Sequence, residues 1–382
     1  MPRTPPSPAD HELINRAAAQ GVTVSARQLE RWRADGLLQP NEVRTLGRGR
    51  GRTSTPSPGA HEMVVWLGRH AGPGKRPGDL ALMAFGEGMP VPEATVRKAF
   101  AEAIKVPLAD DFPPEHSAED VAAANAAKRG RSDPVPARIR RIDAAIAAVL
   151  KAAGTSVADV TRTVLAQFER QAPPAQVEPA TRHDWVHGGT MAALEGAGTL
   201  DVGYLGMLAR GLAPLGVLEP AAEDLELRWP GSEQAAGRLL TPEDGLAFVP
   251  DGSLKEILLR LARETSFPDL RQAWQIAAHL PVWAVDLCDR VEVELATRES
   301  TEALSEWAQT MFGPTRGMLV TAFDSAGQSP GKTAVDALML LFQREALRRL
   351  LAEIPDAEVE NLEQPWAFPP CMTAFMTAST PE

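Results

Sequence analysis

Apolar residues recur along most of the chain at the three- and four-residue spacing of a helix, in stripes interrupted by glycine or proline. This spacing predicts helices over residues 11–20, 25–36, 59–70, 79–85, 92–104, 139–150, 160–168, 254–264, 269–280, 284–295, 301–312 and 333–354. Few runs show the alternation of apolar and polar residues that marks a half-buried strand. The pattern therefore predicts an all-α protein made of compact helical domains rather than one long coiled coil.

The first two predicted helices carry the signals of a helix-turn-helix. Asp10 is the expected N-cap of the first helix, and Ser25 is the expected N-cap of the second. Leu29 and Trp32, three residues apart, predict the buried face of the second helix. Gly36 follows its last turn, at a position where a positive φ is often needed. A braced pair of short helices of this kind is what a DNA-reading helix-turn-helix requires.

The outward face of the second helix is basic and polar, with Arg27, Gln28 and Arg31 off the apolar stripe. Beyond it, residues 47–52 alternate glycine and arginine without an apolar partner, and residues 53–55 read Thr-Ser-Thr. Glycine lets a backbone approach closely, and arginine offers several donors to phosphates or to a narrow minor groove. We therefore interpret this stretch as the wing of a winged helix-turn-helix. The alternative is a solvated loop.

The second helix resembles that of the MerR-type winged helix-turn-helix, in which a capped helix with a leucine and an aromatic ends in Gly-Leu-Leu before the wing. The matching residues are Ser25, Leu29, Trp32, Gly36, Leu37 and Leu38. Residues 46–103 also resemble a group of actinobacterial helix-turn-helix proteins. Residues 30–33 depart from the family, which usually has an arginine, two aromatics and an acid there. The wing also lacks the family's apolar residues, and the long helix that usually makes the family's dimer is missing.

The resemblance implies a sequence-specific DNA-binding transcriptional regulator. Its recognition helix, 25–36, would lie in the major groove, where arginine and glutamine can pair bidentately with guanine and adenine edges. Its wing, 44–55, would contact the backbone or the minor groove. The residues expected to contact double-stranded DNA are Ser25, Arg27, Gln28, Arg31, Arg44, Arg48, Arg50 and Arg52.

A chain of 382 residues is long enough for two or three domains. We expect a disordered start over 1–8, a winged helix-turn-helix domain over 9–105, a linker over 106–136, a larger helical domain over 137–370 and a tail over 371–382. Prolines near both ends of 106–136 indicate the linker. The helical domain is expected to serve self-association as a homodimer, binding of a protein partner, or sensing of a small-molecule effector.

Charge is distributed unevenly along the chain. The net charge of −11 taken alone argues against binding to nucleic acid. Residues 1–80, however, carry 12 lysines and arginines against 7 aspartates and glutamates, whereas the rest carries 27 against 43. A basic head on an acidic body suits a single face that binds a polyanion.

The two cysteines, Cys288 and Cys371, have no spacing typical of zinc or of a disulfide framework, which indicates a reduced compartment. No apolar run approaches the roughly 18 residues that span a bilayer, and the N-terminus lacks the apolar core of a signal peptide. We expect a cytoplasmic protein, associated with the nucleoid when bound to DNA, with no membrane contact and no cofactor.

Residues 326–333 have the loose form of a phosphate-binding loop, in which Lys332 would reach phosphates and Thr333 a magnesium ion. The first glycine of that motif is replaced by Ala326, and no strand–helix series surrounds it. We therefore favour a loop in which Thr333 caps the next helix.

His183 and His187 have the spacing of two metal ligands on one helix face, but Gly188 and Gly189 are expected to end that helix at once. A short surface helix without metal is favoured.

No Ser/His/Asp or Cys/His set has a catalytic spacing, so an enzyme is not expected. The main alternative to a DNA reader is a protein-interaction module with a degenerate helix-turn-helix, and a nucleotide-binding protein using Lys332 ranks third.

Overall fold

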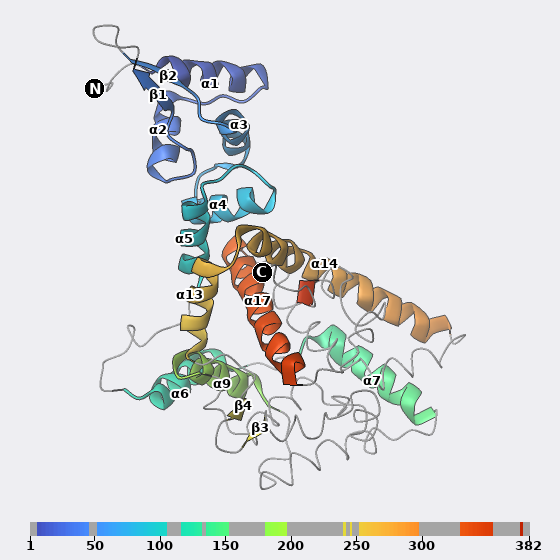
Figure 1. Cartoon of the computed structure of the whole chain (residues 1–382). Coiled ribbons are helices and arrows are strands. Elements are labelled where there is room, and N and C mark those ends of the chain that lie inside the picture. Colours follow the sequence, from blue (N-terminus) through green and yellow to red (C-terminus); the bar gives the residue numbers. More distant parts are fainter. Residues whose placement is uncertain are drawn as a thin grey trace. The chain divides into compact units, whose positions relative to one another are not determined.

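The structure is a computed structural model that describes residues 6–45, 52–104, 116–131, 135–152, 180–196, 240–241, 245–246, 252–297, 329–353 and 375–376. It is mostly helical, with a small two-stranded antiparallel sheet near the N-terminus (Figure 1). The predicted all-α class, with a wing-like sheet after the first two helices, is confirmed. The helices predicted over 160–168 and 301–312 lie outside the described residues.

The chain forms two compact units. The head unit comprises Met1–Ile104, Ala262–Gln275 and Gln328–Ala337, and the body unit comprises Lys105–Leu261, Ile276–Gly327 and Leu338–Glu382. The head unit therefore contains two segments that follow its N-terminal part by more than 150 residues.

The N-terminal segment of the head unit carries the helix-turn-helix and the wing. Its elements are α1 (Pro8–Ala19), α2 (Ala26–Ala34), β1 (Glu42–Thr45), β2 (Arg52–Thr55), α3 (Ala60–His70), α4 (Pro77–Gly86) and α5 (Glu93–Ala103). Strands β1 and β2 pair antiparallel, with Arg44 opposite Thr53 and Thr45 opposite Arg52. Residues 46–51, between the strands, lie outside the described part of the chain.

The start of α1 differs from the prediction. Ser7, rather than Asp10, is the N-cap, and Asp10 takes the third helical position of a reciprocal capping box. Pro8 begins the helix, because its fixed φ and missing N–H suit the first turn. Residues 7 and 8 are thus ordered parts of α1, so the disordered start predicted over 1–8 is wrong for them. The N-cap predicted at Ser25 is confirmed.

The helix-turn-helix core is built from the apolar stripes that the sequence predicts. Leu13, Leu29, Trp32 and Leu37 are each almost fully buried. Gly36 has a φ of 73°, as the position after a helix end often requires. The Gly36 carbonyl also accepts a 2.8 Å hydrogen bond from the Thr95 hydroxyl on α5. Helix α5 therefore fixes the turn that ends α2.

An aromatic cluster joins α4 and α5 to the segment Ala262–Gln275 within the head unit. The Phe85 ring lies 5.9 Å from the Phe100 ring and 4.9 Å from the Phe267 ring, measured between centroids. Trp274 packs edge-on against Phe100, also at 5.9 Å. Such tilted and edge-to-face pairs are the favoured aromatic geometries. The hydrophobic core of the head is thus completed by residues far along the chain.

Arg97 on α5 reinforces the same junction. Its guanidinium donates to the carbonyl oxygens of Ala262 at 3.0 Å and Thr265 at 2.9 Å. These carbonyls belong to the last turn of α13 and the residue after it, where helical carbonyls lack partners within the helix. Arg97 also pairs with Glu93. The arginine therefore satisfies a helix end that comes from a distant part of the chain.

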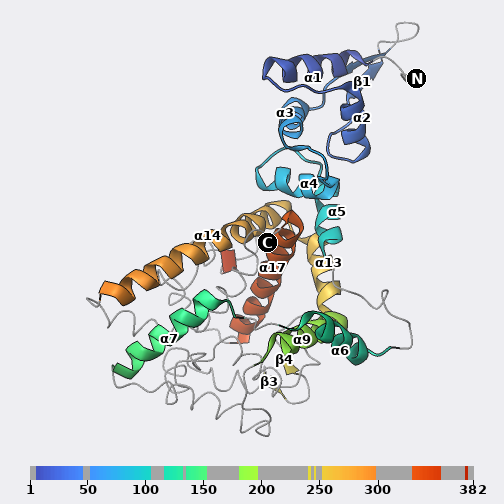
Figure 2. The ribbon, with the colours of Figure 1, turned by 180° about the vertical axis from the view of Figure 1, so that it is seen from behind.

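The remaining described elements are α6 (Ala118–Arg129), α7 (Ala137–Ala152), α9 (Arg182–Leu194), β3 (Leu240–Thr241), β4 (Gly245–Leu246), α13 (Leu254–Glu264), α14 (Phe267–Thr297) and α17 (Pro330–Glu353). In the body unit, α6 and α9 lie side by side (Figure 2). Asn125 on α6 donates a buried 2.9 Å hydrogen bond to the Thr190 hydroxyl on α9. Helix α6 falls within the range that the sequence predicts as a linker.

Two predicted helix breaks are wrong. Gly188 and Gly189 lie inside α9, and Pro281 lies inside α14. A glycine costs a helix about 1 kcal/mol and an interior proline about 3 kcal/mol relative to alanine. Close packing outweighs these local costs, because Gly188 is buried in α9 and Trp283 is buried two residues after Pro281. No helix in the described part of the chain is long and apolar enough to cross a membrane.

The packing of Trp274 on α4 leads to a stability prediction. A Cβ added at Gly86 would lie 2.1 Å from the Trp274 Nε1 atom, whereas one added at Gly72 would meet nothing within 4 Å. We expect Gly86→Ala to lower the free energy of unfolding by about 1–3 kcal/mol, as overpacking does. The control Gly72→Ala should change it by less than about 1 kcal/mol. Denaturant unfolding followed by circular dichroism measures the free energy of unfolding of both variants. Equal values for Gly86→Ala and Gly72→Ala would contradict the packing of Trp274 against Gly86.

Candidate nucleic-acid interface

Helix α2, the predicted recognition helix, turns a hydrophilic face outward. Arg27, Glu30 and Arg31 are exposed, and Gln28 is half-buried. A shallow hollow of about 450 Å³ runs over this face and is lined by Ser25, Arg27, Gln28, Glu30, Arg31 and Ala34. Because Leu29 and Trp32 hold the opposite face in the core, the orientation of the outward residues is set by the fold.

The exposed arginines of α2 and of β1 have no acidic partner among the described residues. Arg27 and Arg31 on α2 and Arg44 on β1 form no ion pair there and are exposed. By contrast, Arg16 on α1 pairs with Glu12 at 2.9 Å, and Lys98 on α5 lies 3.7 Å from Glu102. The guanidinium groups of α2 and the wing are therefore available to an external anion.

A second hollow borders α2 on the side of the loop between α3 and α4. It has a volume of about 470 Å³, and its lining includes Gln28, Arg31, Trp32 and Lys75. Lys75 is exposed and forms no ion pair among the described residues. This lysine is absent from the predicted site residues. Its only sequence signal is its place after Gly-Pro-Gly, and the tertiary fold alone brings it near Arg31.

Two of the predicted wing arginines lie on the paired strands β1 and β2. Arg44 is exposed on β1, and Arg52 is placed in β2 by its backbone only. Arg48 and Arg50 lie outside the described residues. Ser25 is engaged in capping, since its hydroxyl accepts from the Gln28 N–H at 3.3 Å and donates to Gln28 Oε1 at 2.8 Å. Its role in this structure is to begin α2.

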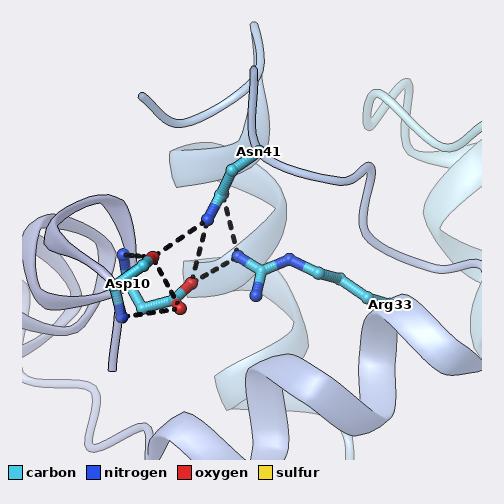
Figure 3. A network of polar contacts seen from close by, with 4 residues as sticks. Asp10, Arg33 and Asn41 are labelled. Atoms are coloured by element: carbon cyan, nitrogen blue, oxygen red, sulfur yellow. Dashed lines mark hydrogen bonds and ion pairs between the residues drawn. The ribbon is translucent and has the colours of Figure 1, made fainter. Parts of the chain in front are cut away.

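A polar network ties α1, α2 and the start of the wing together (Figure 3). The Arg33 Nη2 atom donates to Asp10 Oδ1 at 2.6 Å and to Asn41 Oδ1 at 2.9 Å. Asn41 in turn donates to Asp10 Oδ1 at 3.2 Å and to the Ser7 hydroxyl at 3.3 Å. The side chains of Arg33 and Asp10 are only 17% and 14% exposed, so solvent screens this pair weakly.

The network also sets the ionisation of Asp10. Burial by itself would raise the pKa of this carboxyl, but hydrogen bonds from Arg33, Ser7 and Asn41, together with the Arg33 charge, outweigh that effect. The pKa of Asp10 therefore lies below its ordinary value, and the carboxylate is ionised at neutral pH. The network was not predicted, because its members are separated by up to 34 residues in the sequence.

No protein-family model, curated protein or solved structure matches this chain. The features that bear on its function are the geometry and the charge of α2, the wing and the loop between α3 and α4.

The phosphate-loop motif is only partly described, and its lysine has an internal partner. Lys332 lies in the first turn of α17 and forms an ion pair with Asp336, which is almost fully buried. The Ser329 carbonyl accepts from the backbone N–H groups of Lys332 and Thr333. Because α17 begins at Pro330, Thr333 lies inside the helix, and its predicted role as the cap is wrong.

The histidine pair of α9 lies on a helix longer than predicted. The His187 Nε2 atom lies 2.9 Å from Glu119 on α6, whereas the His183 Nδ1 atom is 3.9 Å from Asp184. Within the described ranges, no group of three or more His, Cys, Asp or Glu side chains is placed to hold a metal ion.

Burial raises the pKa of the Cys288 thiol to about 11, although the nearby Arg138 charge opposes that rise. That thiol is therefore protonated and unreactive at neutral pH.

The ion pair of Asp10 predicts a pH dependence of local stability. Its folded pKa is lowered, so the pair contributes stability above the ordinary value of about 3.9 and loses it as the pH falls through the folded pKa. We expect Asp10→Asn to destabilise α1 and α2 by about 1–3 kcal/mol at pH 7 and to flatten their acid dependence. Hydrogen exchange of peptides covering both helices measures this.

The matched control is Glu12→Gln, which removes an exposed carboxylate paired with Arg16 on the same helix. Exposed pairs of this spacing contribute only about 0.3–0.5 kcal/mol. If both variants exchanged alike at pH 7, the network of Asp10, Arg33 and Asn41 would have no special role.

Proposed function

We propose that this chain is a cytoplasmic, sequence-specific DNA-binding transcriptional regulator of the winged helix-turn-helix type. The observation that carries the proposal is the pair of exposed arginines, Arg27 and Arg31, on the outward face of a capped helix whose opposite face is buried. Neither has an acidic partner among the described residues, whereas the cations on α1 and α5 do. In this proposal, α2 lies in the major groove.

The two arginines suit direct reading of bases. They are four residues apart on α2 and so project from the same side of the helix. A guanidinium can donate two parallel hydrogen bonds to the O6 and N7 atoms of guanine, which is the commonest specific contact in the major groove. Glu30 lies between them and is exposed, and a carboxylate there disfavours phosphate while remaining able to accept from the cytosine amino group.

The surrounding cations suit the DNA backbone. Arg44 extends from β1, and Lys75 lies in the loop that borders α2 on its other side. Phosphate contacts of this kind orient a protein on the duplex and supply affinity without sequence preference. Arg48, Arg50 and Arg52 complete the proposed wing. Fixing α2 relative to the wing is the role we assign to Arg33 and its partners.

The base-reading part of the proposal predicts a loss of specific binding. Starting from the best duplex recovered from a random pool, we expect Arg27→Ala and Arg31→Ala each to weaken binding by about 10- to 100-fold. The control Lys98→Ala removes the same charge from α5, where the lysine lies near Glu102. It should change the affinity less than about threefold. Equal losses in all three variants would indicate a general charge effect and contradict base reading.

The backbone part of the proposal predicts a change in salt dependence. Each phosphate contact contributes about 0.9 to the slope of log K against log salt. We therefore expect the double variant Arg44→Ala/Lys75→Ala to bind with a slope shallower by about 2 units, while the order of preferred sequences is kept. A fluorescence-anisotropy salt series on specific and scrambled duplexes measures both quantities. An unchanged slope would remove these residues from the interface.

The alternative function is a protein-interaction module that uses the same helix pair. The exposed Glu30 on the recognition helix and the acidic remainder of the chain favour it. Under this alternative, folded protein would not bind any duplex even at low salt, and substitution of the wing arginines would leave function intact. The helical body is assigned self-association, partner binding or effector sensing in either case.

A further inference from the structure

Gln28 occupies the first turn of the recognition helix, and its side chain is committed to the helix cap. The Ser25 backbone N–H donates to Gln28 Oε1 at 2.9 Å, and the Ser25 hydroxyl donates to the same oxygen at 2.8 Å. A backbone N–H can only donate, so the atom that faces it must be the amide oxygen rather than the amide nitrogen. The orientation of the Gln28 amide is therefore determined by the cap.

This arrangement uses the whole acceptor capacity of the side chain. An amide oxygen has two lone pairs, and the two donors of Ser25 occupy both. The Nε2 atom carries two N–H donors, and it has no hydrogen-bond partner in the part of the chain that the structure describes. Gln28 also lines both hollows that border α2. It thus faces outward as a donor.

The usual way in which glutamine reads DNA requires both halves of the amide. Glutamine pairs with adenine by accepting from the N6 amino group and donating to N7. The capped Gln28 can donate to N7 but has no lone pair left for N6–H. Guanine presents two acceptors, O6 and N7, in the same place, and thymine presents the acceptor O4. Bases that carry a carbonyl in the major groove therefore match the donors of Gln28. Adenine offers N7 as an acceptor, but its N6 amino group would face the Gln28 donors without an acceptor.

We propose that Gln28 is a specificity-determining residue that selects a keto base, guanine foremost, and rejects adenine, because Ser25 holds its amide oxygen in the cap. The inference rests on the proposed DNA-binding function and assigns a base class to one position of the target. It revises the expectation that Gln28 pairs bidentately with adenine. It also assigns Ser25 an indirect role, as a positioning residue that determines which half of the amide faces the DNA.

The test changes the cap and reads out the preferred base. Binding sites are selected from a random duplex pool with the full-length chain and with Gln28→Glu, which keeps an acceptor for the cap and loses both donors. The base pair read by Gln28 is the one whose preference disappears in this variant. At that position the unsubstituted chain should favour guanine or thymine over adenine by about tenfold or more.

Ser25→Ala then supplies the decisive comparison. It frees one lone pair of Gln28 Oε1 while the backbone N–H still holds the other, so the amide can both accept and donate. We expect the adenine penalty at that base pair to fall by at least about threefold. The matched control is Ser117→Ala, which removes the equivalent cap hydroxyl from α6 in the body unit and leaves Gln28 untouched. It should keep the preference of the unsubstituted chain.

Each outcome separates this inference from the function on which it rests. Binding with a keto preference that Ser25→Ala relaxes and Ser117→Ala keeps supports the inference. Binding in which the unsubstituted chain already prefers adenine at that position, or in which Ser25→Ala changes nothing, overturns the inference alone. Absence of binding to any duplex by the folded, unsubstituted chain at low salt overturns the proposed function and the inference with it.

Discussion

The pair of Asp10 and Arg33 is the interaction on which the geometry of the candidate interface depends. Asp10 caps α1 from within its first turn, Arg33 extends from the end of α2, and Asn41 precedes the wing. One carboxylate therefore fixes three elements at once. Because both charged groups are mostly shielded from water, loss of either partner would leave a charge without compensation, which costs more than the pair itself contributes. The network therefore orients α1, α2 and the wing relative to one another and also stabilises them.

Helix α2 divides its arginines between two tasks. Arg33 points inward and holds the helix in place, while Arg27 and Arg31 point outward and remain without an acidic partner among the described residues. At the N-terminal end of α2, the two polar atoms of the Gln28 side chain also have different tasks. The oxygen of Gln28 holds the start of the helix, and its nitrogen is free to act outside. The atoms that hold α2 in place thus differ from the atoms to which we assign recognition of DNA.

The head is not formed by the first hundred residues alone. Phe267 and Trp274 complete the aromatic cluster of α4 and α5, and Arg97 satisfies carbonyl groups at the end of α13. Aromatic side chains and buried helix ends contribute heavily to stability, so a fragment ending near Ile104 would expose both. The DNA-binding function proposed for the head therefore depends on residues that lie far along the chain. Functional tests belong on the full-length protein.

Local physics determined much of this structure. Ser25, the Leu29 and Trp32 stripe and Gly36 predict a capped helix with one buried face and a left-handed end, because capping, amphipathic spacing and positive φ each depend on neighbours within a few residues. The helix breaks predicted at Pro281 and Gly188 were wrong, because tertiary packing outweighed the low helix propensity of proline and glycine. Only the tertiary structure decided what joins distant residues: Asp10 with Arg33 and Asn41, Lys75 beside Arg31, and Trp274 against α4. Such contacts have no periodicity in the sequence, since they arise when separate helices pack and bring unrelated positions together.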